Sequence, residues 1–437
     1  MRKLLPAILL LAACATVPPQ QPGHFRILQL NDVYKIEGLE GGASGGLARV
    51  RFVRQLLESD GTPVLVLHAG DLLYPSVASK YLDAKQMIDV LNRLDGDANA
   101  DDPHLVVTFG NHELDKGDAT VLLQRLAESK FTWVASNTKY CPTPACDARF
   151  PGVTDVMLAD VGGVKVGIFG ILTPTQKPYA TTTDRLQAAT GAVAALRGQG
   201  ARVVIAITHQ DMPDDVEMVQ KIAGIDLVVG GHDHLYQQQY ANGVWIGKGD
   251  ADAKSILVWD VVVPAAARVQ TVPVRMVLDA AIPKDKAVDE QVRSWMAQLG
   301  EKLGGNETLA TTQYLLEGVE PAVRGRETAL GNLLTDVARE QMQTDVALLN
   351  GGSIRINDNI PPGAVTKYDM EGIFYYTNTL VAFPLTGAQL LDMLRNSVSR
   401  VDAGDGRFLQ VSGITFAYSG APGSWTVDAK DVKVNGQ

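Results

Sequence analysis

The feature that most constrains this chain is a recurring pattern in which a short apolar run ends in a residue that can bind a metal or carry a proton. The run at 105–109 leads into Gly110, Asn111 and His112, and a segment with helical spacing follows. This order predicts a tight strand-to-helix turn at the carboxyl edge of a sheet, where open α/β sheets place ligand chemistry. Asp115 is close enough to orient the imidazole of His112 for proton transfer.

Four other apolar runs end in the same way, and we expect strands at 25–30, 64–67, 203–207 and 227–229. A single histidine or aspartate of this kind is commonly an ordinary surface or core residue, but five such coincidences favour one shared site. Carboxylate, amide and imidazole donors suit Zn, Mn or Fe and exclude a thiolate site. The candidate metal ligands are Asp32, Asp71, Asn111, His209, His232 and His234.

The order of these motifs resembles that of the calcineurin-like metallophosphoesterases. The whole chain resembles the 5'-nucleotidase family, which joins such a domain to a C-terminal nucleotide-binding domain. The resemblance implies an α/β fold, with a four-layer metallophosphoesterase β-sandwich flanked by helices, a linker helix and a second, smaller α/β domain. The boundaries expected on this basis are 24–275 for the first domain, 284–303 for the linker helix and 306–437 for the second domain. Within the first domain, we expect 244–249 and 256–263 to form an antiparallel layer.

The resemblance also assigns roles to the candidate ligands. It implies that Asp71 bridges two divalent cations, that Asn111, His209 and His232 complete one position, and that Asp32 and His234 complete the other. A hydroxide generated between the cations would attack the phosphorus of a phosphate monoester, such as a 5'-nucleotide. His112, oriented by Asp115, would stabilise the transferring phosphoryl group or protonate the leaving alkoxide.

Two tyrosines leave the metal identity open. The family has Asp-x-His where this chain has Asp32 and Tyr34, so Tyr34 is either a plain replacement that weakens one position or a phenolate ligand. Tyr74 follows Asp71 in a Gly-Asp-x-x-Tyr string that resembles the purple acid phosphatases, where this tyrosine binds ferric iron. Packing in a loop is the alternative for Tyr74. Two divalent ions such as Zn or Mn are expected, and a mixed site with Fe remains a candidate.

The second domain matches the family through four short strings. By resemblance, a nucleotide would be bound by Arg326, Asn350, Arg355, Tyr376 and Asn378, with the ring of Tyr376 stacked on the base. We expect a strand to follow Asn378. Nothing before Gln437 matches the family's second base-stacking aromatic, so the pocket is expected to be incomplete or the sequence truncated.

The N-terminus has the pattern of a bacterial lipoprotein signal peptide. Two basic residues precede an apolar run at 4–13, which is too short to span a bilayer and ends at Cys14 in a lipobox-like string. Lipidation of Cys14, with 15–23 as a tether, predicts a location on the periplasmic side of the cell envelope, most naturally at the outer membrane. A plain secretory signal is the alternative. In that oxidising compartment we expect Cys141 and Cys146 to form a disulfide.

The net charge of −10 limits the partners of this chain, because it argues against binding to nucleic acid. A monomer is expected. Other substrates for the same fold are UDP-sugars, cyclic nucleotides and thiosulfate esters. A different class is a non-catalytic lipoprotein that binds nucleotide or metal. The presence of His112 and Asp115 speaks against that class, because binding alone needs neither.

Overall fold

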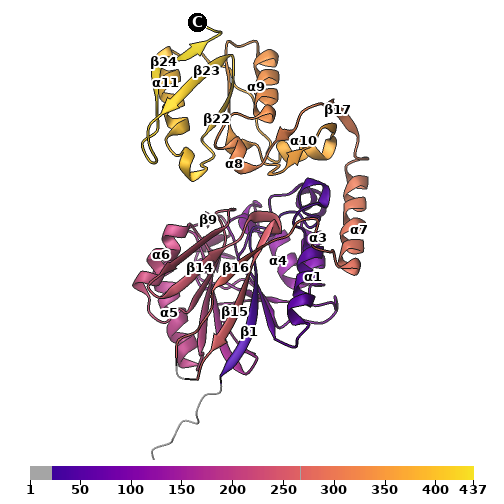
Figure 1. Ribbon diagram of the computed structural model, residues 1–437, viewed down its shortest axis with the longest axis vertical. Coiled ribbons are helices and arrows are strands. Elements are labelled where there is room, and N and C mark those ends of the chain that lie inside the picture. The colour runs from indigo at the N-terminus through magenta and orange to yellow at the C-terminus, as the bar shows by residue number, and fades with distance from the viewer. Residues whose placement is uncertain (1–21, 266) are drawn as a thin grey trace, which may run out of the picture.

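The computed structural model describes residues 22–265 and 267–437, and Figure 1 shows a large domain joined to a smaller one through a long helix. The predicted signal peptide, Cys14 and nearly all of the tether lie outside the described residues. Within the described part of the chain, no helix is both long and apolar enough to cross a membrane.

The larger domain is built on two sheets. The first has seven strands, in the spatial order β16 (Pro273–Val277), β15 (Ser255–Val263), β1 (Gly23–Leu30), β2 (Val64–His68), β3 (Leu105–Thr108), β4 (Thr132–Val134) and β6 (Val153–Thr154). The second has six, in the order β13 (Gln237–Ala241), β14 (Val244–Lys248), β12 (Leu227–Gly230), β11 (Val203–His209), β8 (Val164–Leu172) and β7 (Val156–Val161). Their central strands are parallel and almost continuously apolar, as expected for strands buried on both faces.

The two sheets pack face to face and carry helices on their outer faces. Side chains such as Ile27, Leu67, Ile168 and Ile205 fill the space between the sheets and are fully buried. One outer face is covered by α1 (Leu47–Glu58), α3 (Lys85–Leu91) and α4 (Thr120–Glu128), the other by α5 (Arg185–Gly198) and α6 (Met212–Lys221). The predicted four-layer α/β sandwich is therefore confirmed. A small third sheet contains β5 (Thr138–Tyr140), β9 (Gln176–Lys177) and β10 (Ala180–Thr182), and the disulfide between Cys141 and Cys146 follows β5.

The linker helix α7 (Lys286–Lys302) begins where Asp285 accepts a hydrogen bond from the amide of Val288, and it packs on α1, α2 (Val77–Leu82) and α3. The second domain has α8 (Glu320–Val323), α9 (Ala329–Met342), α10 (Lys367–Ile373) and α11 (Gly387–Val398). Its strand pairs are β17 (Thr308–Thr312) with β21 (Gly363–Thr366), β18 (Leu316–Glu317) with β20 (Asn359–Ile360), β19 (Ala347–Asn350) with β22 (Leu409–Ser412), and β23 (Ile414–Ser419) with β24 (Thr426–Val434).

Three local expectations differ from the structure. The strand expected after Asn378 is wrong, because 377–386 has no regular secondary structure, and Leu380, Val381 and Phe383 in it are exposed. The segments 244–249 and 256–263 do not form one antiparallel layer: β14 pairs in parallel with β12, whereas β15 pairs antiparallel with β1 in the other sheet. The edge strand β16 has no clear apolar period, and the expected domain boundary at 275 falls inside it.

Candidate metal centre and active site

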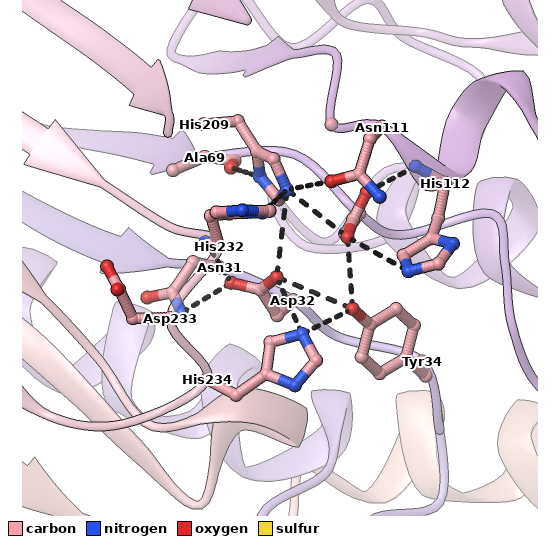
Figure 2. A network of polar contacts seen from close by, with 12 residues as sticks. Asn31, Asp32, Tyr34, Ala69, Asn111, His112, His209, His232, Asp233 and His234 are labelled. Carbon is pink, nitrogen blue, oxygen red and sulfur yellow. Dashed lines mark hydrogen bonds and ion pairs between the residues drawn. The ribbon is translucent and has the colours of Figure 1, made fainter. Parts of the chain in front are cut away.

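The six candidate ligands come together at one rim of the larger domain. Each lies at or just after the carboxyl end of a parallel strand, and the side chains from both sheets point toward one another (Figure 2). His209 Nε2 lies 3.1 Å from Asn111 Oδ1, 3.2 Å from His232 Nδ1 and 3.2 Å from Asp71 Oδ2. Asp32 Oδ1 lies 3.3 Å from His234 Nε2. The donors thus form two adjoining groups, and Asp71 lies close to both.

The backbone at these ligands is unusual. Asp32, Asp71, His232 and His234 have positive φ values of 51°, 57°, 82° and 61°. Non-glycine residues in this region carry a conformational cost of about 1–3 kcal/mol, which persists only where the surrounding structure enforces it. The surrounding fold therefore offsets this cost and aims these four side chains at one point.

Glu113 holds two of the ligand-bearing loops together. This buried carboxylate accepts hydrogen bonds from the amides of Asp71 at 2.9 Å, Leu72 at 2.7 Å and Gly110 at 2.5 Å. Burial and the charge of Asp71 raise the pKa of Glu113 above its usual value. The hydrogen bonds fix the distance between the loop after β2 and the loop after β3, so the positions of Asp71 and Asn111 are linked.

The two candidate tyrosines lie in different environments. The Tyr34 phenol is inside the ligand group, 2.9 Å from His234 Nε2 and 3.1 Å from Asp71 Oδ2 (Figure 2). Burial, Asp71 and Asp32 raise its pKa well above the usual value. The hydroxyl of Tyr74 is buried and has no hydrogen-bond partner among the described residues, while Lys116 lies over its ring. The structure therefore places Tyr34, and not Tyr74, among the predicted ligands.

The donor set fits divalent cations. Ligand atoms of Asp32, Asp71 and His234 all lie within 4.8 Å of one another, and both carboxylates are almost completely buried. Burial by itself would lower the pKa of His209, but the adjacent carboxylates, Asp71 first, raise it to about 9. Two buried carboxylates this close need positive charge nearby, and a cation among these oxygen and nitrogen donors would supply it.

His112 and Asp115 form a hydrogen-bonded pair at the edge of the ligand group. His112 Nδ1 lies 2.7 Å from Asp115 Oδ2, and His112 Nε2 lies 3.9 Å from Asp71 Oδ2. Burial would lower the pKa of His112, but the charges of Asp71 and Asp115 outweigh it and raise the pKa. The imidazole can therefore carry a proton or a positive charge toward a group bound beside the ligands.

A cavity of about 410 Å³ lies at these residues and is lined by residues of both domains. Asp71, Asn111 and His112 line it from the larger domain. Arg324, Arg355 and Arg400 line it from the second domain, the first two beside Glu320 and the third beside Asp405. A negatively charged ligand of nucleotide size would meet both the predicted metal ligands and these arginines in one cavity.

Comparisons with known proteins agree with this arrangement. Residues 25–236 match the family model of the calcineurin-like phosphoesterases, and residues 308–437 match that of the 5'-nucleotidase C-terminal domain. The chain belongs to the 5'-nucleotidase family. This confirms the resemblance read from the motifs, and the larger domain is that of a phosphoester hydrolase.

Individual relatives cover most of the chain. Human 5'-nucleotidase is 26% identical, over 94% of this chain and 79% of its own length. The crystal structure of a 5'-nucleotidase precursor from Thermus thermophilus superposes with a TM-score of 0.76 at 25% identity, over 94% of this chain and 87% of that one. The trifunctional nucleotide phosphoesterase protein YfkN of Bacillus subtilis is 26% identical over 85% of this chain, which spans only 28% of that protein.

The second domain of this 5'-nucleotidase family member places one of the five predicted substrate residues, Arg355, in the cavity lining and a second, Tyr376, beside Arg355. Arg355 lines the cavity, and its guanidinium lies over the ring of Tyr376 at 5.8 Å. The Tyr376 hydroxyl donates to Asp115 at 3.2 Å. Arg326 and Asn350 lie outside the cavity lining: Arg326 pairs with Glu317, and Asn350 donates weakly to a backbone carbonyl. Asn378 is exposed and also lies outside the lining.

Sequence reasoning missed several residues of the site. Arg324 lines the cavity, whereas Arg326, two residues later in the same Arg-Gly-Arg string, points elsewhere. The presence of two arginines in this string was the only sequence feature that pointed to Arg324. Asp252 accepts from the amides of Tyr34 and Lys35 and thereby holds the loop after β1. Neither Asp252 nor Glu320, which contacts His234, lies in a recognisable motif.

Proposed function

We propose that this protein hydrolyses phosphate monoesters, with 5'-nucleotides as substrates and nucleoside and phosphate as products, using two divalent cations. The observation that carries the proposal is the cavity itself. Several of the clustered oxygen and nitrogen donors line it, together with three arginines from the domain that matches the nucleotidase model. Carboxylates and imidazoles suit the cations, and guanidinium groups suit a phosphate.

In this proposal, Asp71 is shared by two cation positions, with Asn111, His209 and His232 at one and Asp32, His234 and Tyr34 at the other. When bound, the cations would polarise the phosphoryl group and activate a water molecule. The contact of Tyr34 with both Asp71 and His234 supports its inclusion in the second group. Metal analysis of the purified protein would distinguish Zn, Mn and a mixed site with Fe.

The chain's other residues bind and orient the substrate. Arg324 and Arg355 would hold the phosphate, because both line the cavity that the predicted metal ligands also line. His112 would hold a proton at Nε2 for the leaving oxygen while Asp115 fixes Nδ1, in keeping with the 2.7 Å contact. The ring of Tyr376, beside Arg355, would stack on the base.

The proposal predicts phosphate release from AMP in the presence of added Mn²⁺ or Zn²⁺, and loss of that release with a chelator. A panel with a UDP-sugar, a cyclic nucleotide and thiosulfate esters would be measured beside AMP, with the products separated by chromatography. The expected products are UMP and a sugar phosphate from the first, a nucleoside monophosphate from the second and sulfate from the third. Faster turnover of one of the alternatives would reassign the substrate. A correctly folded, metal-loaded protein that hydrolyses none of them would support the non-catalytic binding alternative.

We also propose that Cys14 is lipidated and anchors the protein to the cell envelope on the periplasmic side. The lipobox-like sequence supports this, as does the disulfide between Cys141 and Cys146, which suits an oxidising compartment. In cells, Cys14→Ser should shift the protein from the membrane fraction to the soluble periplasmic fraction. Equal membrane retention of the variant and the parent would contradict the anchor.

A further inference from the structure

Glu320 reaches from the second domain across the domain interface to a predicted metal ligand. Its Oε2 lies 2.6 Å from His234 Nδ1, and the opposite nitrogen, His234 Nε2, faces Asp32 Oδ1 at 3.3 Å. Glu320 is only 7% exposed, so the contact is shielded from water. A carboxylate of one domain therefore sets the orientation and the tautomer of an imidazole in the other.

The second carboxylate oxygen of Glu320 contacts the arginines of the cavity. Glu320 Oε1 accepts a hydrogen bond from Arg324 and lies 3.7 Å from Arg355 Nη1. The backbone amide of Glu320 donates to Asn357 Oδ1 at 3.0 Å, which fixes the start of α8. One side chain thus joins the predicted ligand His234 to the two guanidinium groups that line the cavity.

The contact between Glu320 and His234 is important for cation binding because the group next to it, Tyr34, is a phenol. Tyr34 lies beside Asp32 and His234, and a neutral phenol binds a cation more weakly than an imidazole does. Much of the affinity at this position must then come from Asp32, Asp71 and His234. A carboxylate that accepts a hydrogen bond from the far nitrogen of a ligating histidine increases the basicity of that ligand and fixes its orientation.

The same interface has other polar contacts that hold the second domain in this position. Lys35 donates to the carbonyl of Ile356 at 2.8 Å and pairs with Asp358. Tyr368 donates to Glu37 at 2.6 Å. Apart from Glu320, these contacts do not touch a predicted ligand side chain. Movement of the second domain would therefore remove the carboxylate from His234 while leaving Asp32, Asp71 and Tyr34 in place.

We propose that Glu320 is a positioning residue that makes tight cation binding at the Asp32–His234 position depend on the seating of the second domain. This inference rests on the proposed function, which supplies the two cation positions. It adds that the Asp32–His234 position is completed by a residue of the second domain. Because coupling between two equilibria is reciprocal, cation binding at this position must also stabilise the seated arrangement.

Glu320→Gln tests the proposal, because it keeps the size of the side chain and removes its charge. In equilibrium dialysis of the full-length protein with Mn²⁺ alone, the parent should bind two ions. The variant should retain one and bind the second about 10-fold or more weakly. Glu317→Gln is the matched control, since it removes an ion pair to Arg326 in the same segment but outside the cavity. It should bind both ions as the parent does.

Hydrogen exchange supplies a readout that a merely structural role would not change. In the parent and in Glu317→Gln, Mn²⁺ should increase the protection of α8 amides. In Glu320→Gln, this metal-dependent gain should be absent. If Glu320 only stabilised the interface, the variant would lose protection equally with and without Mn²⁺.

Unchanged binding of the second Mn²⁺ by Glu320→Gln, or an unchanged metal-dependent gain at α8, would overturn the proposal. If the Gln variant does not fold, Glu320→Asp takes its place, and the shortened carboxylate should also weaken the second Mn²⁺; parent-like binding would again overturn it. Failure of the parent to release phosphate from any nucleotide, with the second Mn²⁺ still lost in the variant, would reject the proposed activity and leave this inference standing.

Discussion

Replacing Gly110 with alanine is expected to lower phosphate release by about 10²-fold or more and to reduce the metal content of the purified protein. A Cβ at this position would lie 2.5 Å from the amide nitrogen of Asp71 and would overlap its carboxylate oxygen. Neither group can move away freely, because the amide of Asp71 is bonded to Glu113 and its Oδ1 accepts from the amide of His112. Asp71, which is shared by both proposed cation positions, must therefore shift.

Gly117→Ala provides the matched control for this substitution. Gly117 lies in the same connection between β3 and α4, and a Cβ there would meet no heavy atom within 4 Å. Activity assays and metal analysis of the two variants should separate them, with Gly117→Ala close to the parent. Parent-like activity and metal content in Gly110→Ala would contradict the assignment of Asp71 as a ligand.

Replacing His112 with alanine should also lower phosphate release by about 10²-fold or more, but without loss of metal. The contact between the His112 amide and Asp71 Oδ1 is made by the backbone and survives the change. The side chain itself bonds to Asp115 and contributes a proton or a positive charge, not a ligand atom. Steady-state assays at saturating Mn²⁺, combined with metal analysis, would measure both quantities.

His24→Ala is the control for a general effect of removing an imidazole. His24 lies near the opposite end of β1 from Asp32 and pairs with the exposed Asp260. Its removal should change neither activity nor metal content. The role proposed for His112 would be rejected if its alanine variant retained full activity, or if it lost metal together with activity.

Much of the larger domain could be predicted because its signals are local. Apolar runs such as Val203–His209 predict buried strands, and the observed strand ends two residues beyond the expected 203–207. Within each sheet the predicted ligands meet because parallel strands end at the same edge, which the sequence could predict. The packing of the two sheets then brings the two edges to one point. The edge strand β16 could not be predicted from the sequence, because most of its side chains face solvent and its sequence has no clear apolar period.

The second domain was harder to predict, because its residues act through contacts between distant segments. Both Arg324 and Arg326 belong to one short string, and only the packing of α8 against the larger domain decides which of them faces the cavity. Similarly, the segment after Asn378 has the composition of a strand, but no neighbouring strand pairs with it in the described part of the chain. An apolar run becomes a strand only where tertiary structure supplies its hydrogen-bond partners.

The sequence by itself determined the family, the layered α/β fold and the six candidate ligands. Strand periodicity and the residues at strand ends can both be recognised within short segments of the chain. Tertiary structure alone decided that Tyr34 lies among the ligands while Tyr74 does not, and that Glu320 of one domain holds His234 of the other. These outcomes depend on side-chain direction and on the packing of two domains. Neither is contained in the spacing of residues along the chain.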